Sequence, residues 1–242
     1  MITEKVISVH HWSDRTFSFK TTRSQTFKFN AGEFAMCGLN IDGKNVIRAY
    51  SVVSPPWADE LEFLSIKIPD GQLTSKLQHI QVGDEVIMNP KSTGTLRNDA
   101  LIKGGDLYLL ATGTGLAPFM SLIRDVETLE TWENIHIVHS VRNRDDLAYY
   151  DLLSTGFAGD DLEEMVKPVL NYIPIVTGEG GKRITAQLGD TLQIDPTKDK
   201  IMICGNLDFN HEVAEWCKNN GMKEGSLREP GDYVLERAFV EK

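Results

Sequence analysis

The sequence has few cysteines and no long apolar run. Its 242 residues include only three cysteines, Cys37, Cys204 and Cys217. Their odd number and irregular spacing argue against a disulfide framework, and three thiols cannot supply the four ligands of a cysteine-bound iron–sulfur cluster. No stretch of about 18 apolar residues occurs, as a membrane-spanning helix requires, and Met1 to Lys5 show no signal-peptide pattern. We therefore expect a cytoplasmic protein without membrane insertion.

The chain also lacks an excess of positive charge and a metal-binding pattern. Its net charge is −10, with 11 basic and 11 acidic side chains in residues 1–100 but 14 and 24 in residues 101–242. This sign disfavours nucleic-acid binding. His10 and His11 are adjacent, and His136 and His139 are three apart in a predicted strand, where they face opposite sides. We expect neither a nucleic-acid partner nor a metal site.

Two different patterns lie on either side of residue 100. Before it, short strand-like runs alternate with turn residues, at 5–11, 16–20, 34–39, 46–53, 61–68 and 85–88. Beyond it, apolar runs at 107–111, 135–140, 169–176 and 201–204 alternate with helical patterns at 119–128, 146–153, 185–192 and 209–219. The sequence therefore predicts a β plus α/β protein. An antiparallel β-barrel domain occupies residues 1–100, and a parallel-sheet, Rossmann-like domain occupies 101–242, with a hinge at 99–105.

A first motif, Arg48-Ala49-Tyr50-Ser51, lies in the strand predicted at 46–53. Alternation along the strand puts Arg48 and Tyr50 on one face. A guanidinium suits a pyrophosphate and an aromatic ring suits a flat heterocycle, so one elongated ligand such as FAD can use both. The same pair also occurs as a surface arginine beside a half-buried tyrosine, so the motif alone does not decide between these interpretations.

A second motif is the run Gly113-Thr114-Gly115-Leu116-Ala117-Pro118, which follows the apolar strand 107–111. A strand, a glycine turn and a helix form a geometry that cradles phosphate, because the backbone approaches the anion and the helix start supplies free N–H groups. Pro118 stands where a third glycine is usual, and no lysine of a triphosphate-binding loop follows. The motif alone is a weak indication of a dinucleotide site.

A third segment, Asp70-Gly71 followed by Thr74 and Ser75, combines a turn with hydroxyl groups at a predicted helix start. Such a segment can present N–H and O–H donors to an anion. Its residues also fit a simple helix N-cap formed by Thr74 or Ser75, and the sequence leaves both interpretations open.

Four segments together resemble the bacterial ferredoxin–NADP reductases, also called flavodoxin–NADP reductases. They are Arg48–Ser51, Gly113–Pro118, Cys204-Gly205-Asn206 and the tail Glu236–Lys242. The resemblance as a whole runs from near Met1 to Lys242. It implies an FAD-dependent enzyme that moves electrons between NADPH and a one-electron carrier, ferredoxin or flavodoxin, through hydride transfer at flavin N5. A flavin suits this role because it exchanges either one or two electrons.

The resemblance also implies a set of site residues. The implied catalytic residues are Tyr50, Ser51, Cys204 and Glu236. The implied positions that bind FAD or NADP(H) are Arg48, Ala49, Tyr50, Ser51, Leu64, Ile66, Gln72, Leu73, Thr74, Ser75, Gly113, Thr114, Gly115, Arg142, Arg144, Arg183, Gly205, Asn206, Ala238 and Phe239.

The catalytic residues carry distinct implied roles. Tyr50 stacks on the isoalloxazine, Ser51 lies near N5 and Cys204 lines the nicotinamide approach. Glu236 relays a proton, and the tail folds back on the FAD, with Phe239 near the adenine and Ala238 facing the ring. Two simpler interpretations stay open: Cys204 as a small buried residue at a strand end, and Glu236 as the ion-pair partner of Arg237.

Coenzyme choice is where the sequence departs from the family pattern. Arg142 and Arg144 follow the second parallel strand, and Lys182 and Arg183 also match basic positions of the family, so the 2′-phosphate of NADP has candidate partners. Gly178, however, stands where relatives typically carry an arginine. One lost charge-assisted contact costs roughly 1.5–3 kcal/mol, or about ten- to a hundredfold in affinity. We predict a preference for NADPH that is weaker than usual.

The carrier surface is the least determined feature. Because an acidic carrier is repelled by the net negative charge, docking requires a local basic patch, for which Lys20, Arg23 and Lys28 are candidates, although dispersed cations are usually only solvated. The alternatives are the reductase component of an oxygenase or another flavin-dependent electron-transfer complex, and a non-catalytic flavin- or nucleotide-binding module. We expect a monomer.

Overall fold

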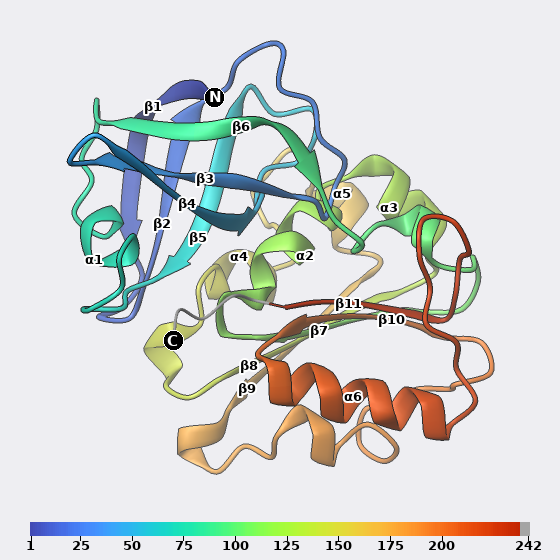
Figure 1. The fold of residues 1–242 in the computed structure, drawn as a ribbon. Coiled ribbons are helices and arrows are strands. Elements are labelled where there is room, and N and C mark those ends of the chain that lie inside the picture. The colour runs from blue at the N-terminus through green and yellow to red at the C-terminus, as the bar shows by residue number, and fades with distance from the viewer. Residues whose placement is uncertain (238–242) are drawn as a thin grey trace.

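The computed structural model describes residues 1–237, and they form two sheets that lie beside each other (Figure 1). The first is a six-stranded sheet in the order β4-β3-β6-β1-β2-β5, and the second has five strands in the order β11-β10-β7-β8-β9. Figure 1 shows α2 between the two sheets and α6 on the opposite face of the second sheet. The predicted fold class is confirmed.

The first sheet is antiparallel throughout and closes into a barrel. An isolated bridge between Val52 and Phe63 joins its edge strands β4 and β5. The buried interior is rich in aromatic rings, which favour the pleated surface of strands. The elements are β1 (Ile2–His11), β2 (Thr16–Thr22), β3 (Phe34–Ile41), β4 (Lys44–Ser51), β5 (Glu60–Ile66), α1 (Thr74–Leu77), β6 (Glu85–Thr93) and the 3-10 turn η1 (Asn98–Ala100).

The second sheet is parallel, and its central strand β7 is buried along nearly its whole length, as a strand covered on both faces should be. Its strands are β7 (Leu107–Thr112), β8 (Ile135–Val141), β9 (Leu170–Val176), β10 (Lys200–Gly205) and β11 (Tyr233–Arg237). Its α-helices are α2 (Ala117–Leu122), α3 (Val126–Thr131), α4 (Tyr150–Ser154), α5 (Glu163–Val166) and α6 (Leu207–Asn219). The 3-10 turns are η2 (Gly113–Leu116), η3 (Arg144–Asp146), η4 (Thr177–Glu179) and η5 (Ile184–Ala186).

Three predicted helices differ from the observed ones. The helix expected at 119–128 is divided, because Asp125 caps α3 by accepting a hydrogen bond from the Thr128 N–H. The helix expected at 146–153 begins late, after Tyr149, whose φ of 59° is incompatible with a helix interior. The prediction for 185–192 was wrong. Only η5 is helical there, and Leu188 and Leu192 are buried from turns instead.

The two halves share one apolar core. A single buried cluster contains Val53 and Leu64 of the barrel together with Leu116 and Phe119 of the second half. Buried hydrogen bonds also cross between the halves: the Ser121 hydroxyl donates to the Ser54 carbonyl at 2.7 Å, and the Tyr149 hydroxyl donates to Glu62 at 2.7 Å. The halves are therefore held together by packed, water-excluded contacts.

Further observations bear on function. Among residues 1–237, the structure contains no helix both long and apolar enough to span a membrane. Within the same residues, no group of three or more His, Cys, Asp or Glu is arranged to hold a metal ion. All three cysteines are buried free thiols.

Candidate flavin and nucleotide site

The predicted nucleotide-binding residues meet at the carboxyl edge of the parallel sheet. Because parallel strands all end on the same side, the segments that follow β7, β8, β9 and β10 lie along one edge, where ligands of such sheets bind. The glycine turn η2 follows β7, and Gly205 and Asn206 follow β10, with Asn206 capping α6. Arg142 and Arg144 follow β8. Arg183 is exposed and lies farther along, directly before η5.

Two glycines allow the ends of β7 and β10 to touch. A Cβ atom on Gly115 would lie 2.1 Å from the Cys204 carbonyl oxygen, and one on Gly205 would lie 2.4 Å from Thr112 Oγ1. Gly113 differs, since its φ is 54° and nothing lies within 4 Å of its Cβ position. The turn thus has close packing on one side and open space at Gly113. This cradle fits a bound dinucleotide phosphate.

His139 supports the same turn, and the sequence had marked it only as an unsuitable metal ligand. Its side chain is fully buried in β8, with Nε2 3.0 Å from the Gly113 carbonyl oxygen and Nδ1 3.3 Å from the Tyr172 hydroxyl. Burial lowers the pKa of His139 to about 4. The neutral ring therefore donates from Nε2 to Gly113 at neutral pH.

Cys204 and Glu236 are neighbours across β10 and β11, where they pair in register. Cys204 is only 2% exposed and belongs to the shared apolar core, and burial raises the pKa of its thiol. Its sulfur is therefore a neutral, buried group at neutral pH.

Glu236 reaches the barrel side of the molecule. Its carboxylate accepts hydrogen bonds from the main-chain N–H of Thr95 and from Thr95 Oγ1, the latter at 3.2 Å. Burial raises the pKa of Glu236, although these hydrogen bonds oppose the shift. Thr95 Oγ1 also lies 3.1 Å from the Leu235 carbonyl oxygen, so its single proton is shared between this oxygen and the Glu236 carboxylate. The last described strand is thereby fastened to the segment that follows β6.

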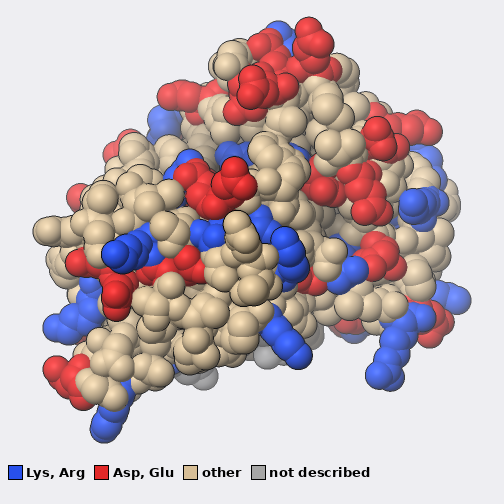
Figure 2. Space-filling view, turned by 90° about the horizontal axis from the view of Figure 1, so that it is seen from above, with Lys and Arg blue, Asp and Glu red and all other residues tan. Residues whose placement is uncertain are grey.

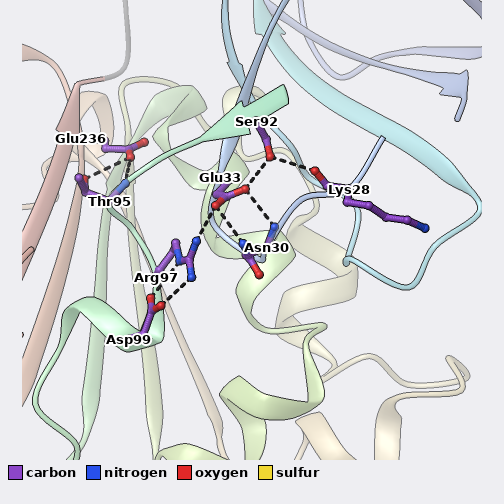
Figure 3. A network of polar contacts seen from close by, with 8 residues as sticks. All are labelled: Lys28, Asn30, Glu33, Ser92, Thr95, Arg97, Asp99 and Glu236. Carbon is purple, nitrogen blue, oxygen red and sulfur yellow. Dashed lines mark hydrogen bonds and ion pairs between the residues drawn. The ribbon is translucent and has the colours of Figure 1, made fainter. Parts of the chain in front are cut away.

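Glu33 organises the adjoining polar network, which Figure 3 shows beside Glu236. Its carboxylate accepts from Ser92 Oγ at 2.6 Å and from Arg97 Nη1 at 2.8 Å, and Arg97 also pairs with Asp99. Burial opposes ionisation, but hydrogen bonds from Ser92, Asn30 and Arg97 outweigh it and hold the pKa of Glu33 below its usual value. The Glu33 carbonyl accepts from the Val52 N–H at 3.0 Å, so the network reaches the end of β4 beside Ser51.

On the barrel, Arg48 lies beside the segment that contains Gln72. Arg48 Nη2 is 3.4 Å from Gln72 Oε1, and Arg48 Nη1 donates to the Ile47 carbonyl at 2.9 Å. Leu73 occupies the N-cap position of α1 without a side-chain cap, so neither Thr74 nor Ser75 caps this helix. The Thr74 hydroxyl instead donates to the Ile68 carbonyl at 3.2 Å. The structure therefore brings Arg48 and Gln72 together, and the binding roles of Arg48 and residues 72–75 stay predictions.

The remaining barrel residues differ in burial. Tyr50 is 9% exposed, its ring packs edge-on against Phe63, and its hydroxyl lies 3.3 Å from Ser65 Oγ. Leu64 is buried in the core shared by the two halves, whereas Ala49, Ser51 and Ile66 are half-buried. The stacking role of Tyr50 and the role of Ser51 stay predictions. Ala238 and Phe239 lie outside the described residues.

Comparison with known proteins assigns the family. Family models described as oxidoreductase FAD-binding domain and oxidoreductase NAD-binding domain match residues 2–95 and 109–215. The chain is 44% identical to the ferredoxin–NADP reductase of Pseudomonas aeruginosa, over 100% of this chain and 99% of that protein. It is also 44% identical to the flavodoxin/ferredoxin–NADP reductase of Rhodobacter capsulatus, over 98% and 93%. The chain belongs to the ferredoxin–NADP reductase family.

A solved structure supports the same assignment for the reductase fold. A ferredoxin NADP+ reductase from Neisseria gonorrhoeae with bound FAD and NADP superposes with a TM-score of 0.89 at 27% identity, covering 98% of each chain. The predictions of an FAD-dependent oxidoreductase and of NADP(H) as its coenzyme are confirmed at the level of the family.

The basic residues considered for carrier docking are mostly engaged within the reductase. Lys20 pairs with Glu60, and Arg23 donates to the carbonyls of Pro56 and Ala58 at 2.8 and 2.6 Å. Arg23 also lies over the Phe29 ring, 4.7 Å from its centre. The face drawn in Figure 2 shows acidic and basic side chains interspersed. Arg23 is thus a structural residue of the barrel.

Proposed function

We propose that this reductase passes electrons between NADPH and ferredoxin or flavodoxin through FAD held on the barrel. The observation that carries the proposal is the contact of the glycine turn with the barrel: Leu116 of η2 and Leu64 of β5 belong to one buried cluster. The edge suited to a nucleotide and the strands expected to hold a flavin therefore adjoin. Bound FAD would supply the exchange between two-electron and one-electron chemistry.

The chain's own residues would bind and orient the two ligands. Arg48 would hold the FAD pyrophosphate, together with the segment 72–75 beside it, because a guanidinium fork matches phosphate oxygens. The open backbone at Gly113 would receive the NADPH pyrophosphate at the start of η2, the turn that leads into α2. Arg142, Arg144 and Arg183, all exposed, would approach the 2′-phosphate.

Two residues would act near the reacting atoms. Cys204, buried and neutral, would exclude water from the nicotinamide approach without adding charge. Glu236 would hold a proton at Oε1 or Oε2 over a wider pH range than an ordinary carboxyl group, because burial raises its pKa. Thr95 would fix the orientation of that carboxyl group.

The decisive experiment is anaerobic mixing of the FAD-loaded protein with NADPH, and separately with NADH, while the flavin absorbance is followed. Rapid bleaching by NADPH followed by reoxidation with isolated ferredoxin or flavodoxin supports the proposal. Bleaching without transfer to either carrier would favour the reductase component of an oxygenase. A protein that does not take up FAD would contradict the proposal and favour a non-catalytic module.

We also propose that the chain works as a cytoplasmic monomer. The contacts that join the flavin side to the nucleotide side, such as Ser121 with Ser54 and Tyr149 with Glu62, lie within one chain. No second copy is needed to complete the site. Sedimentation equilibrium at micromolar concentration tests the monomer, and fractionation of cells tests the location.

A further inference from the structure

We propose that Glu179 weakens the preference of this reductase for NADPH by holding Arg144 in an ion pair. The inference deepens the proposed function, since it assumes that Arg144 approaches the 2′-phosphate of the coenzyme. The sequence pattern had not marked Glu179. In this inference, Glu179 determines how readily Arg144 can bind the phosphate.

The two side chains form a two-point contact. Arg144 Nη2 lies 2.6 Å from Glu179 Oε2, and Arg144 Nε lies 3.3 Å from Glu179 Oε1. The guanidinium therefore presents two of its donors to the carboxylate, as in a fork-to-fork pair. A 2′-phosphate that binds the same face of the guanidinium needs these two donors, so the coenzyme and Glu179 compete for that face of Arg144.

The position of Glu179 is set by the backbone around it. The Thr177 hydroxyl donates to the Val141 carbonyl at 3.1 Å, and the Gly178 N–H donates to the Arg142 carbonyl at 2.9 Å. Gly180 then reverses the chain with a φ of 90°. These bonds fasten the turn η4 to the end of β8, directly beside the segment that carries Arg144.

A close backbone contact at position 178 explains why glycine stands there in place of an arginine. A Cβ atom there would lie 2.4 Å from the Arg142 carbonyl oxygen, a distance that real side chains do not tolerate. The close approach of η4 to β8 therefore requires glycine at 178. The same approach brings the Glu179 carboxylate beside the segment that follows β8. The position of η4 therefore excludes an arginine at 178 and pairs Arg144 with a carboxylate.

Glu179 affects the two coenzymes differently. A phosphate dianion at Arg144 must displace the carboxylate or bind beside it, and the like charges repel. A coenzyme without the 2′-phosphate meets no such repulsion, and a carboxylate can accept a hydrogen bond from its ribose 2′-hydroxyl. Because both side chains are largely exposed, at 62% for Arg144 and 48% for Glu179, the effect is moderate and screened by salt.

The test measures binding by calorimetry, with 2′-phospho-AMP and AMP as probes and the FAD-loaded protein in low salt. We expect Glu179→Gln to tighten 2′-phospho-AMP about two- to fivefold, as the loss of an exposed ion pair allows, and to leave AMP unchanged or slightly weaker. The gain should shrink in about 0.5 M salt. In turnover, the ratio of kcat/KM for NADPH over NADH should rise by a similar factor.

A matched control separates this local effect from a change in net charge. Glu215 has the same 48% exposure and forms a comparable surface pair with Lys218 at 3.2 Å. Glu215→Gln should therefore leave the affinities for 2′-phospho-AMP and for AMP unchanged. In the background of Arg144→Gln, Glu179→Gln should no longer tighten 2′-phospho-AMP. The inference is overturned if Glu179→Gln leaves the ratio of the two affinities unchanged, or if Glu215→Gln changes it equally. Failure of flavin reduction by both coenzymes would instead contradict the proposed function.

Discussion

The imidazole of His139 hydrogen-bonds to the main-chain carbonyl of Gly113, with Nε2 3.0 Å from the oxygen. This bond joins β8, the neighbour of the central strand β7, to the turn that follows β7, and the His139 side chain that makes it is fully buried. Nothing lies within 4 Å of the Cβ position of Gly113, so the turn is open on that side. The hydrogen bond to the Gly113 carbonyl helps to hold this open turn in place. A buried polar residue thus supports the turn that we propose as the coenzyme site.

Replacement of His139 should weaken coenzyme binding. His139→Leu leaves the Gly113 carbonyl without its donor, which we expect to cost about 1–2 kcal/mol in stability and to raise the Kd of NADP+ about three- to tenfold. Calorimetric titration with NADP+ provides the measurement. Tyr172→Phe is the control, since it removes only the contact at Nδ1. Equal losses in the two variants would show that the Gly113 bond has no specific role.

The same histidine should make the protein sensitive to mild acid. Its folded-state pKa of about 4 lies below the unfolded value of 6.5, so the unfolded chain binds the proton first as pH falls. The stabilising contribution is complete above pH 6.5 and is lost between pH 6.5 and about 4, for a total of about 3 kcal/mol. Urea unfolding of wild type and His139→Leu across this range should show the gap between their free energies of unfolding close and then reverse in favour of the variant. A constant gap would contradict the prediction.

Two glycines of one turn should respond differently to the same substitution. Gly115→Ala drives a methyl group against the Cys204 carbonyl, so we expect a loss of at least about 2 kcal/mol and a disturbed nucleotide site. In Gly113→Ala the added methyl group points into open space, so we expect a loss of stability of only about 1 kcal/mol, which comes from the positive φ. Chemical denaturation of both variants checks the order. If Gly113→Ala is the more damaging of the two, the close approach of β7 and β10 is not what selects glycine at 115.

Arg97 should be needed to keep Glu33 ionised within the protein. Arg97→Met removes the 2.8 Å partner of a carboxylate that is only 7% exposed, and we expect a loss of about 2–3 kcal/mol at pH 7. Ser92 and Asn30 retain part of the compensation. Because the pKa of Glu33 is lowered, its contribution is present above pH 4.5 and declines below it, so the deficit of the variant should shrink in acid.

The exposed partner of Arg97 provides the comparison. Asp99 is 54% exposed, so Asp99→Asn should cost less than about 1 kcal/mol. Equal losses for Arg97→Met and Asp99→Asn would show that the energy resides in the surface pair and not in Glu33.

Glu236 should contribute one ionisation to the pH dependence of turnover. Glu236→Gln keeps an oxygen that accepts from Thr95 but cannot hold a transferable proton, so we expect electron transfer to a carrier to slow by roughly ten- to a hundredfold. The pH–rate profile of the wild type should show an apparent pKa above that of an ordinary glutamate, absent from the variant. Thr95→Ala should shift this ionisation without removing it. Superimposable profiles for wild type and Glu236→Gln would exclude the proton role.

The sequence predicted the features that depend on local pattern. The apolar run before Gly113 forms the central strand, in which each of its first five residues is buried, and the glycine turn follows where expected. The helix predicted at 185–192 failed for a local reason as well. Leu188 and Leu192 have helical spacing, but Gly189 lies between them and turns bury both side chains. Periodicity alone does not distinguish these two ways of burying an i, i+4 pair.

The site was predictable only in part, because several of its contacts join distant segments. Arg48 was singled out from a motif that carries its own chemistry, and Gln72, which lies beside it, from the family resemblance. His139 and Gly113 are 26 residues apart, and Thr95 and Glu236 are 141 apart. Nothing in the residue types at these positions specifies the partner, and only the folded chain determines it.

The apolar cluster that runs through both halves has a thermodynamic consequence. Neither half retains a complete core if the other unfolds, because Leu64 and Val53 pack in the same cluster as Leu116 and Phe119. The protein is therefore two units by topology, and we expect the two to unfold as one cooperative unit. A ligand that binds either half stabilises both, so bound flavin and bound coenzyme each raise the free energy of unfolding of the whole protein.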